Sequence, residues 1–198
     1  MNRFFPNINS VDMTNLQIDD IGEYSITKPE EADLITQIII NETKDTDTIL
    51  DAMAGSGGNT ISFCTRFNKV ISVESDMPRF DILKNNLDQY NFTNYTVFYD
   101  DCLNVIDKAK NNIIFFDPPW GGKNYLKQEN VELSISGFKI WMILKYILSE
   151  NKNCNIFLKI PSNFNLLKLK TELLSFENIK IFKFDIGKFL LLRIYVNS

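Results

Sequence analysis

The sequence contains no histidine. This absence excludes a Ser-His-Asp triad, a Cys-His pair and a histidine-based zinc site, because each of them needs an imidazole. The only three cysteines, Cys64, Cys102 and Cys154, lie far apart and do not have the spacing of metal ligands. We therefore expect no metal, and chemistry that uses carboxylates, lysines, amides, hydroxyls, backbone groups or a cofactor.

Long apolar runs are missing as well. No stretch of about 18 apolar residues occurs, so we expect no membrane span. The first ten residues, MNRFFPNINS, lack the apolar core of a secretory signal. We expect an intracellular protein with reduced thiols, and a monomer.

The chain has 198 residues, of which 44% are hydrophobic, and this suits one α/β domain with a large core. The net charge of −4 is unevenly spread, because residues 1–101 carry 7 Lys and Arg against 17 Asp and Glu, whereas residues 102–198 carry 14 against 8. The basic C-terminal half suits a polyanion such as RNA, although an ordinary solvated surface accounts for it equally well.

Hydrophobic periodicity predicts strands that alternate with helices. The predicted strands are 47–52, 69–74, 95–99, 112–116 and 154–160, and the predicted helices are 28–41, 58–67, 78–90, 136–149 and 163–174. Residues 1–24 look irregular or weakly helical, and Thr27 with Glu30 fits a capping box. The alternation predicts a mostly parallel sheet, to which a C-terminal hairpin turning at 186–188 adds an antiparallel edge. Ligands of such sheets bind beyond the carboxyl ends of the strands.

A glycine-rich turn follows the first predicted strand, as Asp51-x-x-x-Gly55-x-Gly57-Gly58. Glu74 ends the second strand, where a carboxylate can accept hydrogen bonds from ribose hydroxyls, and Asp101 follows the third. An NAD site is possible, but the spacing is not G-x-G-x-x-G, and no Walker lysine follows. Because an acidic residue before the glycines disfavours a pyrophosphate and suits a cation, we favour S-adenosylmethionine as the ligand. A plain tight turn is the simpler alternative.

The sequence Asp117-Pro118-Pro119-Trp120 follows the fourth predicted strand. It resembles the Asp/Asn/Ser-Pro-Pro-aromatic motif of methyltransferases that act on exocyclic amines. Hydrogen bonds from such an amine to Asp117 and to the Pro118 carbonyl direct its lone pair toward a methyl group, and consecutive prolines fix the carbonyl's direction. Trp120 offers a surface on which a base stacks. In the alternative interpretation, Asp117 caps a turn and Trp120 is a core residue.

Several stretches, in order along nearly the whole chain, are similar to the trimethylguanosine synthase family. They are GEYSITKPE (22–30), DAMAGSGGNTISF (51–63), VISVESD (70–76), LKNNLDQYN (83–91), DPPWGGKNY (117–125) and FLKIPSNF (157–164). The resemblance implies a Rossmann-like class I methyltransferase fold that transfers methyl from S-adenosylmethionine to N2 of a 7-methylguanosine RNA cap. Two departures are an extra Lys28 before the proline and Lys123 in place of a proline.

The resemblance also implies residue roles. Cofactor-binding residues would be Thr27, Asp51, Ala52, Gly55, Gly57, Asn59, Thr60, Glu74, Asp101, Cys102, Asp117 and Pro119. Catalytic residues would be Asp117, Pro118 and Trp120, and substrate-binding residues would be Tyr24, Trp120, Lys159 and Asn163, with Lys159 and Asn163 near the cap phosphates or base. Residues 1–27 would form an N-terminal extension or lid, and residues 28–198 the catalytic domain.

Other interpretations stay open at this point. The D-P-P-W sequence suits an N6-adenine or other exocyclic-amine methyltransferase on RNA or DNA equally well, and a non-enzymatic RNA-binding subunit is a third possibility. The number of methyl groups added is not encoded in any motif. Trp141 lies in an apolar helical stripe and is interpreted as core, with a second stacking role as the alternative. The pair Asn85-Asn86 is interpreted as a surface or capping feature.

Overall fold

The computed structural model describes residues 3–8, 11–109 and 112–197. Contacts divide the chain into two compact units, Met1–Ala109 and Lys110–Ser198, and each unit is described by itself. The first contains α1 (Asp20–Ser25), α2 (Pro29–Thr43), β1 (Thr48–Asp51), α3 (Gly58–Cys64), β2 (Lys69–Glu74), α4 (Met77–Gln89), β3 (Tyr95–Tyr99) and α5 (Cys102–Ala109). The second contains β4 (Ile113–Phe116), η1 (Gly122–Lys127), β5 (Ser134–Ile135), β6 (Phe138–Lys139), α6 (Ile140–Glu150), β7 (Asn155–Pro161), α7 (Leu166–Leu173), β8 (Ile179–Asp185) and β9 (Phe189–Val196).

The first unit is built on three parallel strands in the order β3-β2-β1. Their central residues, among them Ile49, Leu50, Val70 and Val73, are buried and β-branched or aliphatic, as expected for strands covered by helices. Helix α3 packs against α2 and against both β1 and β2, while α4 contacts β2 and β3. Because the strands are parallel, Asp51, Glu74 and Tyr99 come to the same end of this part of the sheet.

The start of α2 differs from the predicted capping box. The helix begins at Pro29, and the backbone N–H of Lys28 donates to Glu31 Oε2 at 3.3 Å, so Glu31 and not Glu30 reaches back to the cap. The hydroxyl of Thr27 instead accepts a hydrogen bond from Asn59 Nδ2 at 3.0 Å. The physical reason is Pro29, which is favoured as the first helical residue and moves the cap to Lys28.

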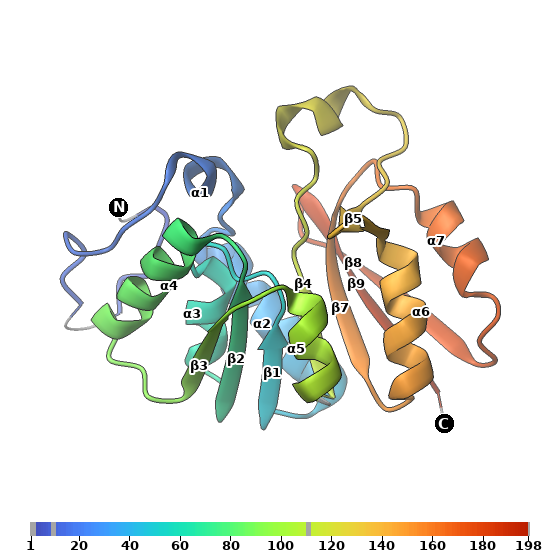
Figure 1. The fold of residues 1–198 in the computed structure, drawn as a ribbon, viewed down its shortest axis with the longest axis horizontal. Helices are drawn as coiled ribbons and strands as arrows, with labels where there is room; N and C mark the ends of the chain where they lie inside the picture. Colours follow the sequence, from blue (N-terminus) through green and yellow to red (C-terminus); the bar gives the residue numbers. More distant parts are fainter. Residues whose placement is uncertain (1–2, 9–10, 110–111, 198) are drawn as a thin grey trace. The chain divides into compact units, whose positions relative to one another are not determined.

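Four of the strands of the second unit, in the order β4-β7-β9-β8, form its larger sheet, and β5 and β6 form a separate hairpin (Figure 1). Strands β4 and β7 are parallel, whereas β9 is antiparallel to both β7 and β8. The hairpin turns at 186–188, as predicted, and Gly187 there has φ +96°. A mostly parallel sheet with a C-terminal antiparallel hairpin is therefore confirmed.

The predicted helix 136–149 begins four residues too early. Ser136 and Gly137 both have positive φ (+50° and +84°) and form the turn of the β5-β6 hairpin, so α6 starts only at Ile140. Two consecutive left-handed residues are typical of a two-residue hairpin turn and cannot continue a helix. The Ser-Gly dipeptide was the available signal, and the apolar stripe that follows concealed it.

Helix α5 was not predicted, and α1 was anticipated only as weak helical character within residues 1–24. Helix α5 begins at Cys102, where Asp101 Oδ1 accepts from the backbone N–H of Leu103 at 2.9 Å. Helix α1 is capped by Asp19, whose Oδ1 accepts from Gly22 N at 2.7 Å. Both are short, and an aspartate before each start is the signal that predicts them.

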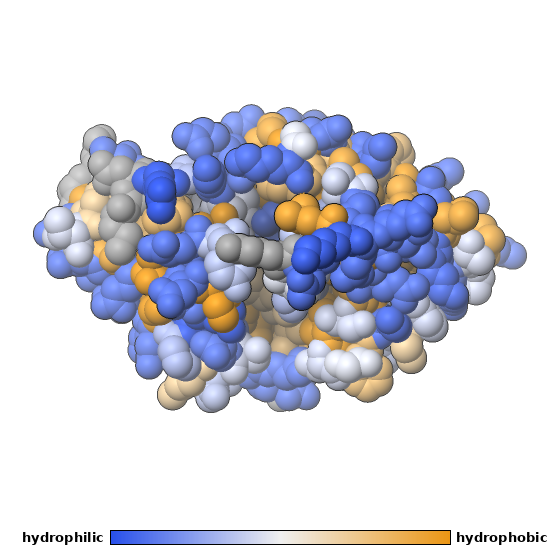
Figure 2. All heavy atoms as spheres, turned by 90° about the horizontal axis from the view of Figure 1, so that it is seen from above, coloured by the Kyte–Doolittle hydropathy of each residue, from blue (hydrophilic) through white to orange (hydrophobic). Residues whose placement is uncertain are grey.

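The surface mixes polar and apolar residues. Figure 2 shows apolar side chains in small groups between hydrophilic ones on the face that it displays. Leu126, Leu167 and Leu174 are 70%, 76% and 74% exposed. None of the helices in the described ranges is long and apolar enough to cross a bilayer. The described residues also contain no cluster of three or more acidic or thiol groups suited to a metal ion.

Candidate active site

The glycine turn after β1 brings the backbone close to open space. Gly55 has φ +56° and Gly57 has φ +101°, both in the left-handed region that favours glycine. A methyl group built on Gly55 meets no atom within 4 Å, whereas one built on Gly58 lies 2.7 Å from the Thr27 carbonyl oxygen. Gly58 is thus required for packing of the N-terminal segment, and Gly55 leaves room for a ligand.

Glu74 closes the other side of this turn. Its Oε2 accepts from Gly55 N at 2.9 Å, and its Oε1 accepts from Asp76 N at 2.8 Å. The residue is 8% exposed, so these bonds fix the carboxylate at the end of β2. Each carboxylate oxygen has a second lone pair, which leaves acceptor capacity for hydroxyl groups of a ligand.

Asp51 is completely buried at the end of β1. Its Oδ2 accepts from Thr60 Oγ1 at 2.6 Å, and Thr60 is in turn 3.4 Å from Ser72 Oγ. Burial raises the pKa of the neighbouring Cys64 thiol to about 12, and the negative charge of Asp51 adds to this effect. Because Asp51 is buried, its negative charge acts on nearby groups such as the Cys64 thiol through surroundings of low polarity.

The N-terminal segment is anchored to the glycine turn through Asn86. The Asn86 amide donates to the carbonyl oxygens of Gln17 and Ser56 at 2.8 and 3.0 Å, and its Oδ1 accepts from Gln17 N at 2.8 Å. Asn86 is 0% exposed, so its interpretation as a surface or capping residue is wrong. Its neighbour Asn85 donates to the Asn15 carbonyl at 3.0 Å, and together they tie residues 15–17 to α4.

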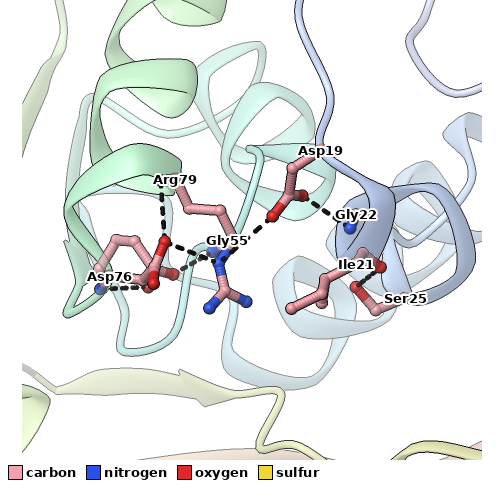
Figure 3. Close-up of polar contacts among 8 residues, drawn as sticks. Asp19, Ile21, Gly22, Ser25, Gly55, Asp76 and Arg79 are labelled. Carbon is pink, nitrogen blue, oxygen red and sulfur yellow. Dashed lines mark hydrogen bonds and ion pairs between the residues drawn. The ribbon is translucent and has the colours of Figure 1, made fainter.

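An ion pair makes a second link to this segment. Figure 3 shows Arg79 of α4 between Asp76, at 3.4 Å, and Asp19 at the start of α1, at 3.8 Å. Gly22 on α1 lies against the turn, because a methyl group there would be 2.6 Å from Ser56 Oγ. The Oγ of Ser56 and the Oδ1 of Asn59 are buried and have no hydrogen-bond partner among the described residues. Beside the glycine turn, the Ser56 hydroxyl can therefore still donate or accept a hydrogen bond, and the Asn59 carbonyl oxygen can still accept one.

The remaining predicted residues of the first unit differ in accessibility. Tyr24 is 60% exposed on α1, and Ala52 is buried in the turn. Cys102 is buried, and burial raises the pKa of its thiol to about 12, with the neighbouring Asp101 as the second cause. A thiol of this kind stays protonated and acts as a small apolar surface.

In the second unit, Asp117 directly follows β4 and lies beside Lys159 of β7. Lys159 Nζ is 2.7 Å from Asp117 Oδ2, and the two side chains are only 5% and 17% exposed. Pro118 is buried and Pro119 is exposed. The sequence predicted Lys159 near phosphates or base, and the structure places its ammonium on the carboxylate of Asp117.

Aromatic side chains surround this ion pair. The ring of Trp120 makes an edge contact with Tyr125 at a centroid distance of 5.2 Å and lies 6.5 Å from Phe189. Lys159 Nζ is 5.5 Å from the centroid of Trp120 and 4.7 Å from that of Phe189. Tyr125 and Phe189 were not among the predicted site residues. The Tyr in W-G-G-x-x-Y was a signal for the first, and no motif marks the second.

Asn163 supports the loop that carries Tyr125. Its Nδ2 donates to the carbonyl oxygens of Tyr125 and Gln128 at 2.9 and 2.8 Å. Its Oδ1 and Trp120 Nε1 are buried and have no hydrogen-bond partner among the described residues. Asn163 thus acts at least partly on the protein's own loop.

Parallel strands alternating with helices, with a glycine-rich turn after β1, a buried carboxylate at the end of β2 and the D-P-P-W sequence after β4, are the arrangement of a class I methyltransferase. Solved structures agree on the fold. The chain is similar to a precorrin-6y C5,15-methyltransferase from Geobacter metallireducens (TM-score 0.62, 15% identity, 98% of this chain and 100% of that one). It is also similar to an rRNA methylase from Streptococcus thermophilus (TM-score 0.57, 12% identity, 83% and 95%).

Residues 46–192 match the family described as RNA cap guanine-N2 methyltransferase, and the chain belongs to this family. An uncharacterized protein of Acanthamoeba polyphaga mimivirus is 30% identical to this chain, and the match covers 93% of this chain and 80% of the viral protein. The trimethylguanosine synthases of Schizosaccharomyces pombe and Saccharomyces cerevisiae are 32% and 25% identical over 52% and 82% of this chain. These matches span only 45% and 54% of the two yeast proteins.

Proposed function

We propose that the protein transfers methyl groups from S-adenosylmethionine to the exocyclic N2 amine of a 7-methylguanosine RNA cap. The observation that carries this proposal is Asp117-Pro118-Pro119-Trp120 at the end of β4, in a chain whose family is described by that activity. Dimethyl and trimethyl caps are both compatible with it.

The first unit would hold the methyl donor. Open space beside Gly55 lets a ligand approach the backbone, and the buried Ser56 Oγ and Asn59 Oδ1, which have no partner in the described part of the chain, suit polar groups of the ligand. Glu74 would accept hydrogen bonds from ribose hydroxyls, and Asp51 would favour the positive charge of the donor. The other residues of this unit proposed to bind the donor are Thr27, Ala52, Gly57, Thr60, Asp101 and Cys102.

The second unit would hold the amine. When bound, S-adenosylmethionine supplies an electrophilic methyl group on a sulfonium. Asp117 and the Pro118 carbonyl accept hydrogen bonds from the amine, so that its lone pair points away from them. Asp117 or water would take up the proton that the nitrogen releases when it accepts the methyl group. Alignment of this kind is worth about 7–11 kcal/mol.

The indole ring of Trp120 favours binding of a 7-methylguanosine cap over binding of an unmodified guanine. Methylation at N7 makes the base cationic, and a cation over an indole gains about 0.5–2 kcal/mol. Stacking on the ring contributes roughly 1–3 kcal/mol for any base. Tyr24, on the exposed side of α1, and Asn163 are the further residues proposed to contact the cap.

A transfer assay with labelled S-adenosylmethionine tests the proposal. The acceptors are 7-methylguanosine diphosphate, guanosine diphosphate and an adenine-containing oligonucleotide. We expect label on the first alone. Label on the oligonucleotide alone would replace the proposal with an adenine-N6 methyltransferase, and no label on any acceptor, together with no calorimetric binding of the donor, would indicate a non-enzymatic RNA-binding subunit.

A further inference from the structure

The ion pair between Lys159 and Asp117 joins two strands at the candidate amine site. Strands β4 and β7 are paired in parallel with Phe116 opposite Leu158, so the next residue on each strand is Asp117 on one and Lys159 on the other. Their charged atoms are 2.7 Å apart, and both side chains are largely removed from water. A carboxylate and an ammonium at this distance hold each other's orientation strongly where solvent is excluded.

Lys159 also lies against the aromatic surface. Its ammonium is 4.7 Å from the centroid of Phe189 and 5.5 Å from that of Trp120. A positive charge is thus already present at the ring on which the base is proposed to stack. A second cation placed there meets repulsion from Lys159, which Asp117 offsets.

We propose that Lys159 is a positioning residue for Asp117 and not a phosphate-binding residue. This inference rests on the proposed function. Lys159 is 4% exposed and its ammonium is committed to a carboxylate and two rings, which leaves it poorly placed to receive a flexible phosphate chain. Its role is to keep Asp117 in the orientation that receives the amine, while its charge weakens binding of a cationic base.

Lys159→Met is expected to change turnover and affinity in opposite senses, with a lower kcat and tighter binding of the cap analogue. In Lys159→Met, misorientation of Asp117 lowers kcat by about 100-fold. The Kd of 7-methylguanosine diphosphate falls by about two- to tenfold, because the charge of Lys159 no longer repels the cationic base, and the Kd of guanosine diphosphate changes little. Lys159→Arg keeps the charge and recovers part of kcat. A loss of affinity for 7-methylguanosine diphosphate but not for 7-methylguanosine would instead identify a phosphate contact and overturn the proposal.

A double variant tests whether Lys159 acts through Asp117. If it does, Lys159→Met lowers kcat much less in an Asp117→Asn background than in the wild type. If the two residues act independently, Lys159→Met lowers kcat by the same factor in both backgrounds, and this result would overturn the proposal. Binding is followed by tryptophan fluorescence, so the affinity prediction is tested even if the wild-type enzyme methylates none of the three acceptors, an outcome that would refute the proposed function alone.

The chain provides a matched control for lost stability. Lys145 of α6 is 3.3 Å from Glu172 and lies 5.1 Å from the ring centroid of Trp141, so it also pairs with a carboxylate beside a tryptophan, although its side chain is 33% exposed and Glu172 also binds Lys168. Lys145→Met is expected to leave kcat and the ratio of the two nucleotide affinities unchanged. Equal changes in both variants would mean that general destabilisation explains the result, and the proposal would fall.

Discussion

Replacement of Gly55 by alanine tests whether the open space at the glycine turn belongs to the methyl donor. The new methyl group meets no atom of residues 3–8, 11–109 or 112–197 within 4 Å, so the variant introduces no clash with them. The left-handed φ of +56° costs an alanine about 1–2 kcal/mol, and the stiffer unfolded chain returns about 0.4–1 kcal/mol. A net loss of about 1 kcal/mol lowers the Tm of a chain this size by roughly 2–4 °C.

Binding of the donor should suffer more than stability. A methyl group that intrudes on a close contact costs about 1–3 kcal/mol, which corresponds to a Kd raised by about 5- to 150-fold. Calorimetric titration with S-adenosylhomocysteine measures this directly. Gly187→Ala is the matched control, because Gly187 also has positive φ with open space around it but lies in the β8-β9 turn. If Gly55→Ala loses stability as expected yet binds like the control, the donor does not approach the backbone here.

Three further predictions concern other positions. Trp120→Ala should weaken cap binding by about 1–3 kcal/mol and leave donor binding intact, and a parallel loss of both in titrations would make Trp120 a structural residue. Asn86→Ala should lower the free energy of unfolding in urea by about 2–3 kcal/mol, because it leaves partly buried backbone groups of Gln17 and Ser56 without partners, whereas Asn85→Ala should cost under about 1 kcal/mol. Burial raises the pKa of the Cys154 thiol from 9.0 to about 12, so the unfolded state loses this proton first, and this one thiol should lower stability by up to about 1.4 kcal/mol per pH unit above pH 9. A Cys154→Ala variant whose stability falls with pH as steeply as that of the wild type between pH 9 and 10 would contradict this.

The sequence predicts the strands of the sheet well because their patterns are strong and local. The strands 69–74 and 95–99 were predicted with the bounds that the structure has. The miss at 136–139 arose where a Ser-Gly turn adjoined an apolar stripe, so two local signals competed and the longer one was followed. Trp141 in that stripe is half-buried beneath Lys145 and not fully in the core.

The partners of polar side chains were harder to predict, because they depend on residues distant in sequence. The burial of Asn86 follows from contact with Gln17 and Ser56, separated from it by 69 and 30 positions. The pairing of Lys159 with Asp117, 42 positions away, depends on which strands are neighbours and in which register. Motifs identify residue types that suit a reaction, whereas register decides which of these types meet.

The identity of the methylated atom distinguishes cap guanine-N2 methylation from every other methyl transfer. The product of a reaction with 7-methylguanosine diphosphate is digested to nucleosides and compared, by mass spectrometry and chromatography, with standards methylated at N2 and at other positions. We expect one or two methyl groups, all on N2. Methylation at any other atom, or at an adenine amine in a competing oligonucleotide while the cap analogue stays unmodified, would contradict it.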